Sequence, residues 1–178
     1  LVERHADELS RLDVEETGKP WTVMRDGELP FAVDNLRFFA ASARSLHGTA
    51  AGEFSPGYTS MLVRRPAGVV AAITPWNFPI AIPIWKAAPA LAFGNTVVLK
   101  PSELSPLTAI HIAECFEAAG LPAGVFNVLC GEGVRVGEVL ATSPDVTGLS
   151  FTGSVRTGKH LASQAVAHGK KYQLELGG

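Results

Sequence analysis

The sequence has little cysteine, no cluster of basic residues and no long uninterrupted apolar run. Its two cysteines form no CxxC pair and its five histidines share no spacing, so we expect surface histidines, no disulfide framework and no metal. The most apolar stretch, residues 80–93, contains a lysine and two prolines and is too short to span a membrane. No signal peptide is apparent, so a cytoplasmic protein without a membrane partner is expected.

Charge is also nearly balanced, at −2 over 178 residues. Residues 1–60 hold six Lys/Arg against ten Asp/Glu, whereas residues 61–178 hold nine against seven. The second part therefore suits a small anionic ligand but lacks the clustered basic residues of a nucleic-acid surface. Hydrophobic content of 47% is typical of a globular domain, and the length fits one domain.

Apolar periodicity divides the chain into three segments. Residues 1–46 predict N-terminal helices, one over residues 1–17 that stops at Gly18 and Pro20, and one from about Pro30 to Leu46. Residues 47–66 contain the break "HGTAAGEF" and the short alternating stretch "GYTSMLVRRP", which indicate a hairpin or arm. The sequence starts at Leu1 within a helical pattern and stops just after a strand pattern, so we expect a piece of a longer protein.

Residues 67–178 alternate apolar strand patterns with helical ones, which predicts an α/β fold. The expected strands are "AGVVAAI", "NTVVLK", "VFNVLC", "VTGLSF" and "KYQLEL". The expected helices are "IWKAAPALAF", "PLTAIHIAECFEAAG", "RVGEVLAT" and "SVRTGKHLASQAVAH". This order is typical of a Rossmann-like open parallel sheet with helices on both faces, which binds ligands at the carboxyl ends of its strands.

Polar or glycine-rich residues follow each of these strands. In "ITPWNFP", Pro75 and Pro79 restrict the backbone, so the turn either aims a side chain or simply ends the strand. In "KPSE", Lys100 and Glu103 are either ligand contacts for a ribose or a solvated surface pair. "GEGVRVG" is either a stretched dinucleotide fingerprint or a turn before a helix.

Two further stretches leave alternatives open. "GSVRTGKH", residues 153–160, suits a phosphate at a helix N-terminus but places His160 where a P-loop needs a hydroxyl; a tight turn with packing glycines is the alternative. Glu175 has apolar neighbours that predict burial, which would raise its pKa and make it a general base. A salt-bridged structural acid is equally consistent with the pattern.

Taken together and in this order, "ITPWNFP", "GNTVVLKPSE", "FTGSVRTG" and "LELGG" closely resemble the aldehyde dehydrogenase superfamily, over nearly the whole chain. The resemblance implies that Asn77 donates its amide to an oxyanion and that Glu175 activates water. It implies that Lys100 and Glu103 contact the cofactor riboses and that Gly153 and Ser154 form the pyrophosphate turn. Further cofactor contacts implied in this way are Ile73, Thr74, Pro75, Trp76, Ser102, Gly133, Gly137, Phe151, Thr152, Leu176 and Gly177.

The implied reaction oxidises an aldehyde to a carboxylic acid through a cysteine thiohemiacetal, with NAD⁺ as the expected cofactor and NADP⁺ as the alternative. "FFAASARSLHG" and "PWNFPIAIPIWKAAPAL" resemble members that act on amino- or oxo-substituted semialdehydes. The resemblance also implies a homodimeric or homotetrameric parent whose oligomerisation arm includes "GYTSMLVRRP".

The chain departs from the family pattern because the nucleophilic cysteine lies beyond the glutamate motif. Neither Cys115 nor Cys130 matches it, and both are expected to be buried packing residues. Val134 stands where relatives often have proline. The resemblance thus implies that residues 1–178 are a truncated cofactor-binding domain, with a Rossmann-like core over 67–178, an absent catalytic domain and no activity alone. A nucleotide-binding module with a degenerate P-loop and a non-catalytic relative are the alternative functions.

Overall fold

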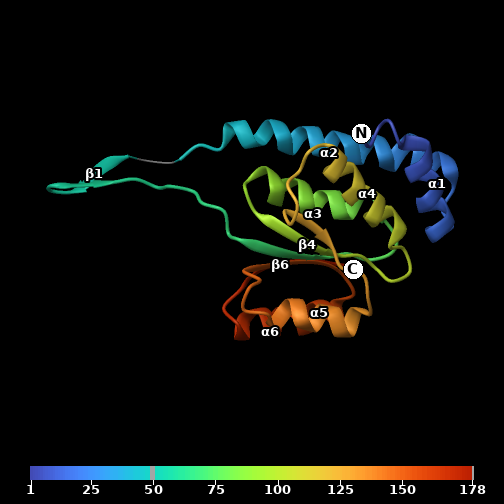
Figure 1. Ribbon diagram of the computed structural model, residues 1–178. Helices are drawn as coiled ribbons and strands as arrows, with labels where there is room; N and C mark the ends of the chain where they lie inside the picture. Colours follow the sequence, from blue (N-terminus) through green and yellow to red (C-terminus); the bar gives the residue numbers. More distant parts are fainter. Residues whose placement is uncertain (49–50, 178) are drawn as a thin grey trace.

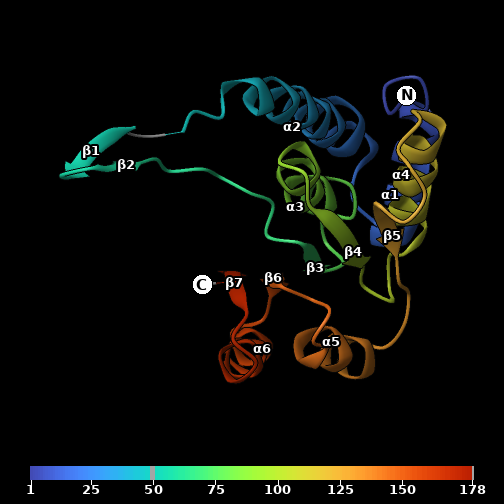
Figure 2. The ribbon, with the colours of Figure 1, turned by 60° about the vertical axis from the view of Figure 1, so that its left-hand side comes forward.

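The computed structural model describes residues 1–48 and 51–177, and its centre is a parallel sheet of five strands (Figures 1 and 2). The strands are β3 (Val69–Ile73), β4 (Thr96–Lys100), β5 (Phe126–Val128), β6 (Gly148–Gly153) and β7 (Lys171–Leu176), in the spatial order β5-β4-β3-β6-β7. The central strands β3 and β4 are apolar runs rich in β-branched residues, which suits their position between helices on both faces of the sheet. The predicted open parallel α/β sheet is confirmed.

Helices cover both faces of the sheet. On one face lie α3 (Ala81–Ala92) and α4 (Leu107–Ala118), and on the other α5 (Gly133–Thr142) and α6 (Val155–Ala167) (Figure 1). Successive residues of β3 point to opposite faces, so Ala72 packs with Ala109 of α4 while Ala71 packs with Leu140 and Leu161. The sheet is therefore a rigid platform between two apolar cores.

The N-terminal helices form an outer layer against α3 and α4. They are α1 (Ala6–Thr17), a π-helical turn η1 (Val23–Glu28), α2 (Leu29–Ser42) and a 3₁₀ turn η2 (Ala43–Ser45). Gly18 ends α1 in a left-handed conformation, φ +72°, as its position predicts. The second helical segment begins earlier than the predicted Pro30. A π-helical turn precedes this proline, which has no N–H to contribute to the helix.

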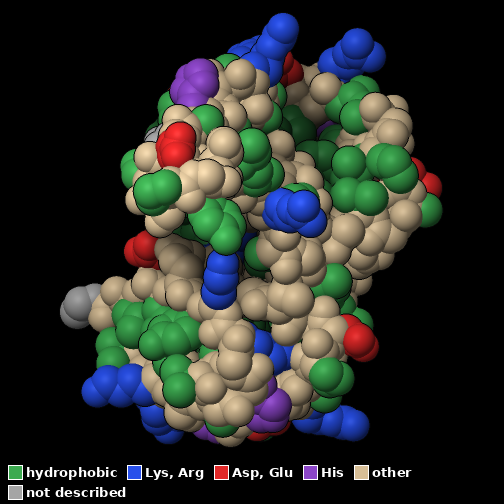
Figure 3. Space-filling model, turned by 90° about the vertical axis from the view of Figure 1, so that its left-hand side faces the viewer, with side chains coloured by type: hydrophobic (Ala, Val, Ile, Leu, Met, Phe, Trp, Pro, Cys, Tyr) green, Lys and Arg blue, Asp and Glu red, His purple; other side chains and the backbone are tan. Residues whose placement is uncertain are grey.

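A hairpin projects from the domain (Figure 1). It consists of β1 (Gly52–Ser55) and β2 (Tyr58–Ser60), so its first strand lies before "GYTSMLVRRP", inside the expected break. Thr49 and Ala50 of that break lie outside the described residues. Figure 3 views the molecule from the hairpin side, where hydrophobic side chains gather in patches. The exposed apolar residues on and after the hairpin are Phe54, Tyr58, Met61, Leu62 and Val63.

Among the described helices, none combines the length and apolarity that a membrane span requires.

Candidate functional site

The site lies where the strand order of the sheet reverses. The chain runs from β3 outward to β4 and β5, and then returns to place β6 on the other side of β3. Ile73 at the end of β3 pairs in register with Lys100 of β4 and with Phe151 of β6. The polar segments that follow three strands therefore meet at one edge, which is where such sheets bind ligands.

Two cavities open along this edge, and they meet at Pro75, Thr152 and Gly153. The first has a volume of about 740 Å³ and is bordered by the turn after β3, by α3 and by β7. The second has a volume of about 820 Å³ and lies between the end of β4 and the first turns of α5 and α6. An elongated ligand with two ends can occupy both.

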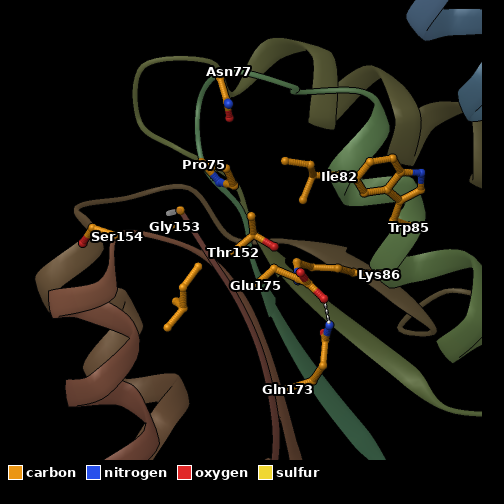
Figure 4. Close-up of a pocket in the computed structure, with 12 residues that line it drawn as sticks. Pro75, Asn77, Ile82, Trp85, Lys86, Thr152, Gly153, Ser154, Gln173 and Glu175 are labelled. Carbon is orange, nitrogen blue, oxygen red and sulfur yellow. Dashed lines mark hydrogen bonds between the residues drawn. The ribbon is translucent and has the colours of Figure 1, made fainter.

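The turn after β3 presents Asn77 to the first cavity. Figure 4 shows its side-chain amide directed inward from the turn. The amide is exposed and makes no hydrogen bond to any other described residue, so its N–H groups are available to a ligand. Three bonds hold residues 74–77 of the turn: the Thr74 amide donates to the Lys100 carbonyl over 3.1 Å, Ser105 donates to the Trp76 carbonyl, and Lys19 donates to the Asn77 carbonyl.

Glu175 reaches the first cavity from β7, but the expectation that it is buried is wrong. It is exposed, because alternation along β7 places its apolar neighbour Leu174 against the α5/α6 face and Glu175 on the opposite one. On that face runs a chain of hydrogen bonds. Lys86 donates to Ser150 over 2.9 Å, and Ser150 donates to Gln173 over 2.6 Å. Gln173 in turn donates to Glu175 over 2.7 Å, the bond drawn as a dashed line in Figure 4. One carboxylate oxygen of Glu175 is therefore the last acceptor in this chain of hydrogen bonds.

Lys86 is a site residue that the motifs did not identify. It lies on α3, is 8% exposed and lines the first cavity. Burial lowers the pKa of its ammonium group from 10.5 to about 8, and the Glu175 carboxylate opposes this shift. The available signal was its position as the one charged residue in the apolar stretch 80–93.

We expect Lys86→Met to stabilise the folded chain at neutral pH. Below pH 8 the folded and unfolded states both hold the Lys86 proton, so the cost of burying the charge is fully present. That cost is up to about 3 kcal/mol, since one unit of pKa is worth about 1.4 kcal/mol. Between pH 8 and 10.5 the unfolded state binds more protons, so the wild-type chain gains stability as the pH rises and the advantage of the variant shrinks.

Urea unfolding of the two chains at about pH 7 and about pH 9.5 measures this difference. Lys171→Met is the matched control, because Lys171 is exposed on β7. A Lys86→Met chain that is less stable than wild type at both pH values contradicts the prediction.

The Lys100 and Glu103 pair lines the second cavity. Lys100 Nζ lies 2.8 Å from Glu103 Oε2, with the lysine side chain 3% and the glutamate side chain 52% exposed. The Lys100 hydrogen bond, aided by backbone N–H groups that include that of Gly133, holds the pKa of Glu103 below its ordinary value. Nearby, the buried hydroxyl of Thr74 has no hydrogen-bond partner among the described residues. The cavity thus offers an ionised acceptor, a buried cation and an unsatisfied hydroxyl.

Two helices begin at the second cavity. α5 starts at Gly133, and Ser154 caps α6 by accepting a hydrogen bond from the Thr157 amide over 3.3 Å. The first-turn amides of both helices favour an anionic group there. Arg156 also lines this cavity, although we did not single it out from the sequence.

The glycines of "GSVRTGKH" have identifiable packing roles. A Cβ on Gly158 would lie 2.4 Å from Leu176, and one on Gly153 would lie 2.6 Å from the Phe151 ring. His160, at the position where a P-loop needs a hydroxyl, is bonded to Glu138 over 2.6 Å. These contacts favour the packing turn over the degenerate P-loop.

The structure brings the predicted site residues together with one exception. Trp76 is 50% exposed and lines neither cavity. The predicted site residues that line the first cavity are Pro75, Asn77, Thr152, Gly153, Ser154, Glu175, Leu176 and Gly177. Those that line the second are Ile73, Thr74, Pro75, Lys100, Ser102, Glu103, Gly133, Gly137, Phe151, Thr152 and Gly153. Gly178, the last residue of "LELGG", lies outside the described residues.

The cysteines lie outside both cavities. Cys115 is 7% exposed in α4, and burial raises the pKa of its thiol. Cys130 is exposed just after β5, so the expectation that both are buried is wrong for Cys130. Its strand is at the edge of the sheet and ends at Val128, which leaves the following residues in solvent.

Two of the histidines that we expected at the surface come together, and the side chain of one of them, His111, is only 15% exposed. His5 and His111 stack edge to face, and their ring nitrogens lie 3.2 and 3.7 Å from Glu8. Glu114 lies 3.3 Å from the other nitrogen of His111. The packing of α1 on α4 creates this cluster, which spacing along the chain cannot show.

Comparison with known proteins matches residues 1–178 to the aldehyde dehydrogenase family. The NADP/NAD-dependent aldehyde dehydrogenase PuuC of Escherichia coli is 45% identical over 100% of this chain and 36% of its own length. The 2-aminomuconic semialdehyde dehydrogenase of Bos taurus is 43% identical over 100% of this chain and 37% of its own length. The crystal structure of betaine aldehyde dehydrogenase from Staphylococcus aureus in complex with NAD⁺ has a TM-score of 0.96 at 38% identity, covering 99% of this chain and 35% of that one.

Proposed function

The chain belongs to the aldehyde dehydrogenase family, and we propose that it is the cofactor-binding part of an enzyme that oxidises an aldehyde to a carboxylic acid with NAD⁺. It spans little more than a third of the length of the relatives it matches. In this proposal residues 1–46 are N-terminal helices, residues 47–66 are an arm, residues 67–178 are the Rossmann-like core, and the nucleophilic cysteine belongs to the remainder of the full-length protein. The observation that carries the proposal is the pair of joined cavities at the strand-order reversal, one bordered by Asn77 and Glu175 and the other by Lys100 and Glu103.

The second cavity fits the adenosine and pyrophosphate parts of a dinucleotide. Glu103 accepts hydroxyl hydrogens from a ribose, Lys100 supplies a buried positive charge, and the Thr74 hydroxyl needs a partner that a ligand would provide. Ser154 and the first turns of α5 and α6 would hold the pyrophosphate. When bound, the nicotinamide group supplies an acceptor for the hydride that leaves the substrate.

The first cavity holds the groups that act on the substrate. Asn77 donates its amide N–H groups to the oxygen on which negative charge develops. Glu175 takes a proton from the water that releases the acid, and its bond from Gln173 fixes the orientation of its carboxylate. The hydrogen-bond chain back to Lys86 ties that orientation to α3.

The substrate, assembly and compartment are part of this proposal. An amino- or oxo-substituted semialdehyde is supported by the likeness to a 2-aminomuconic semialdehyde dehydrogenase. A homodimeric or homotetrameric full-length protein is supported by the projecting hairpin, whose apolar residues and unpaired strand edges suit pairing with another chain. The two unpaired cysteines suit the reducing cytoplasm.

Ligand titration tests the proposed function directly. We expect this chain to bind NAD⁺ more tightly than NADP⁺, and not to bind ATP with Mg²⁺. A free 2′-hydroxyl can donate to the ionised Glu103, whereas a 2′-phosphate is repelled by it. Calorimetry with the three nucleotides separates the dehydrogenase from a P-loop module. Tight ATP–Mg²⁺ binding without NAD⁺ binding would refute the proposal.

A substitution at Glu103 sharpens this test. Glu103→Gln removes the repulsion and leaves Lys100 to attract a phosphate, so the NAD⁺ to NADP⁺ affinity ratio should fall roughly tenfold. Glu132→Gln is the matched control, because Glu132 lines the same cavity and none of the described hydrogen bonds joins it to Lys100. An unchanged ratio in Glu103→Gln, or an equal fall in the control, would contradict the assignment of Glu103.

A further inference from the structure

We propose that Lys19 is a positioning residue for Asn77, fixing the backbone of the turn so that the Asn77 amide is aimed at the reacting oxygen. This inference rests on the proposed role of Asn77 as the oxyanion donor. Lys19 lies in the loop after α1, far along the chain from the turn, and none of its atoms lines either cavity. It therefore acts through Asn77 and does not touch the substrate.

The Lys19 ammonium group has three N–H donors and three acceptors in reach. Its Nζ lies 3.0 Å from Asp13 Oδ1, 2.6 Å from Glu28 Oε2 and 3.0 Å from the Asn77 carbonyl oxygen. The side chains of Lys19, Asp13 and Glu28 are only 11%, 0% and 12% exposed. The Lys19 ammonium group is thus held by a carboxylate of α1 and a carboxylate of the π-helical turn η1. Its third hydrogen-bond acceptor is the Asn77 carbonyl in the turn after β3.

The bond from Lys19 to the Asn77 carbonyl is the one that acts on the candidate site. A bond to the Asn77 carbonyl restrains the plane of the Asn77–Phe78 peptide, and with it the backbone from which the Asn77 side chain extends. Lys19 Nζ also lies 4.9 Å from the centroid of the Phe78 ring, which adds a second attraction to the same point of the turn. The other two anchors, at Thr74 and at the Trp76 carbonyl, hold the segment before Asn77. Lys19 holds the Asn77 carbonyl itself, and beyond it the Ile82 amide donates to the Phe78 carbonyl over 3.2 Å.

The energetics of the cluster favour a role in positioning. Burial raises the pKa of Asp13, although the Lys19 hydrogen bond opposes the shift, and the second oxygen of Asp13 has no hydrogen-bond partner among the described residues. Buried ion pairs of this kind add little to stability relative to an apolar replacement of the same volume. The hydrogen bonds of such a cluster do specify one arrangement of its groups, and here that arrangement includes the Asn77 carbonyl of the turn after β3.

A double-mutant cycle on the full-length enzyme tests the inference. In Lys19→Met we expect kcat to fall about 10- to 100-fold, because a displacement of about 1 Å at a reacting group costs up to about 10²-fold. The KM for NAD⁺ should not change. In the Asn77→Ala background, Lys19→Met should cause no further loss, because there is no amide left to position. Arg11→Met is the matched control, since it removes an exposed ion pair from α1, the helix that precedes Lys19, and it should leave kcat unchanged.

The outcomes that overturn the inference are distinct from those that overturn the proposed function. Additive losses in the double variant would show that Lys19 acts independently of Asn77 and would overturn this inference alone. Near-normal kcat in Asn77→Ala would remove Asn77 from the mechanism and both proposals with it. If Lys19→Met does not fold, the triple variant Asp13→Asn, Lys19→Met, Glu28→Gln removes the buried charges together. A folded triple variant with normal kcat would overturn the inference.

Discussion

In the full-length enzyme, Asn77→Ala is expected to lower kcat by about 10²- to 10³-fold, the loss that follows removal of one oxyanion donor from a preorganised site. The side-chain amide is directed into the first cavity and is not consumed by any hydrogen bond to another described residue. Its donors therefore need no reorganisation when charge develops on the substrate oxygen. Alanine leaves the turn and its three backbone anchors in place, so the effect should fall on the chemical step.

Steady-state and single-turnover kinetics distinguish that result from a general loss of structure. The Kd of NAD⁺ should stay within about twofold of wild type, because Asn77 does not line the second cavity. Asn35→Ala is the matched control, since Asn35 is half-buried on α2, away from both cavities, and its amide donates to the Phe31 carbonyl of its own helix. A variant whose kcat is near normal would show that Asn77 takes no part in the reaction.

Local pattern was sufficient to predict the fold because each core element carries its own signal. Runs such as "VVAAI" are typical of strands in a sheet covered on both faces, and their alternation with helical patterns favours a parallel sheet. The early start of the second helical segment was missed, because a proline inside a helix usually marks a boundary. The π-helical turn before Pro30 is a compensation that propensity does not predict.

The part of the candidate site that follows the ends of the strands could be predicted from the sequence. The rule that ligands bind at the carboxyl ends of parallel strands located Asn77, Lys100 and Gly153 from sequence position alone. The exposure of Glu175 was predicted wrongly, because in a strand the flanking residues lie on the opposite face and their burial says nothing about the residue between them. Lys19 and Lys86 were missed because their partners are brought near only by tertiary packing.

This chain by itself is expected to show no aldehyde oxidation, which is the largest effect that the proposed function predicts. Hydride leaves a tetrahedral alkoxide that forms when a thiolate attacks the aldehyde carbon, so the reaction needs a cysteine at the first cavity. Cys115 is buried in α4 with a raised pKa, and Cys130 follows the edge strand β5. Neither lines either cavity, so Asn77 has no oxyanion to stabilise and Glu175 has no thioester against which to activate water.

The test is to purify the chain, establish its fold by circular dichroism, and follow the absorbance of reduced cofactor with a panel of aldehydes beside the full-length protein. NAD⁺ binding without turnover is the expected result, because the ribose pair and the helix N-termini of the second cavity are complete within this chain. The chain would then bind the cofactor at the second cavity without carrying out the reaction proposed for the first. Turnover that is lost in Cys130→Ser, and kept in Cys115→Ser, would instead identify the exposed thiol as a nucleophile that reaches the site by a movement of the segment after β5.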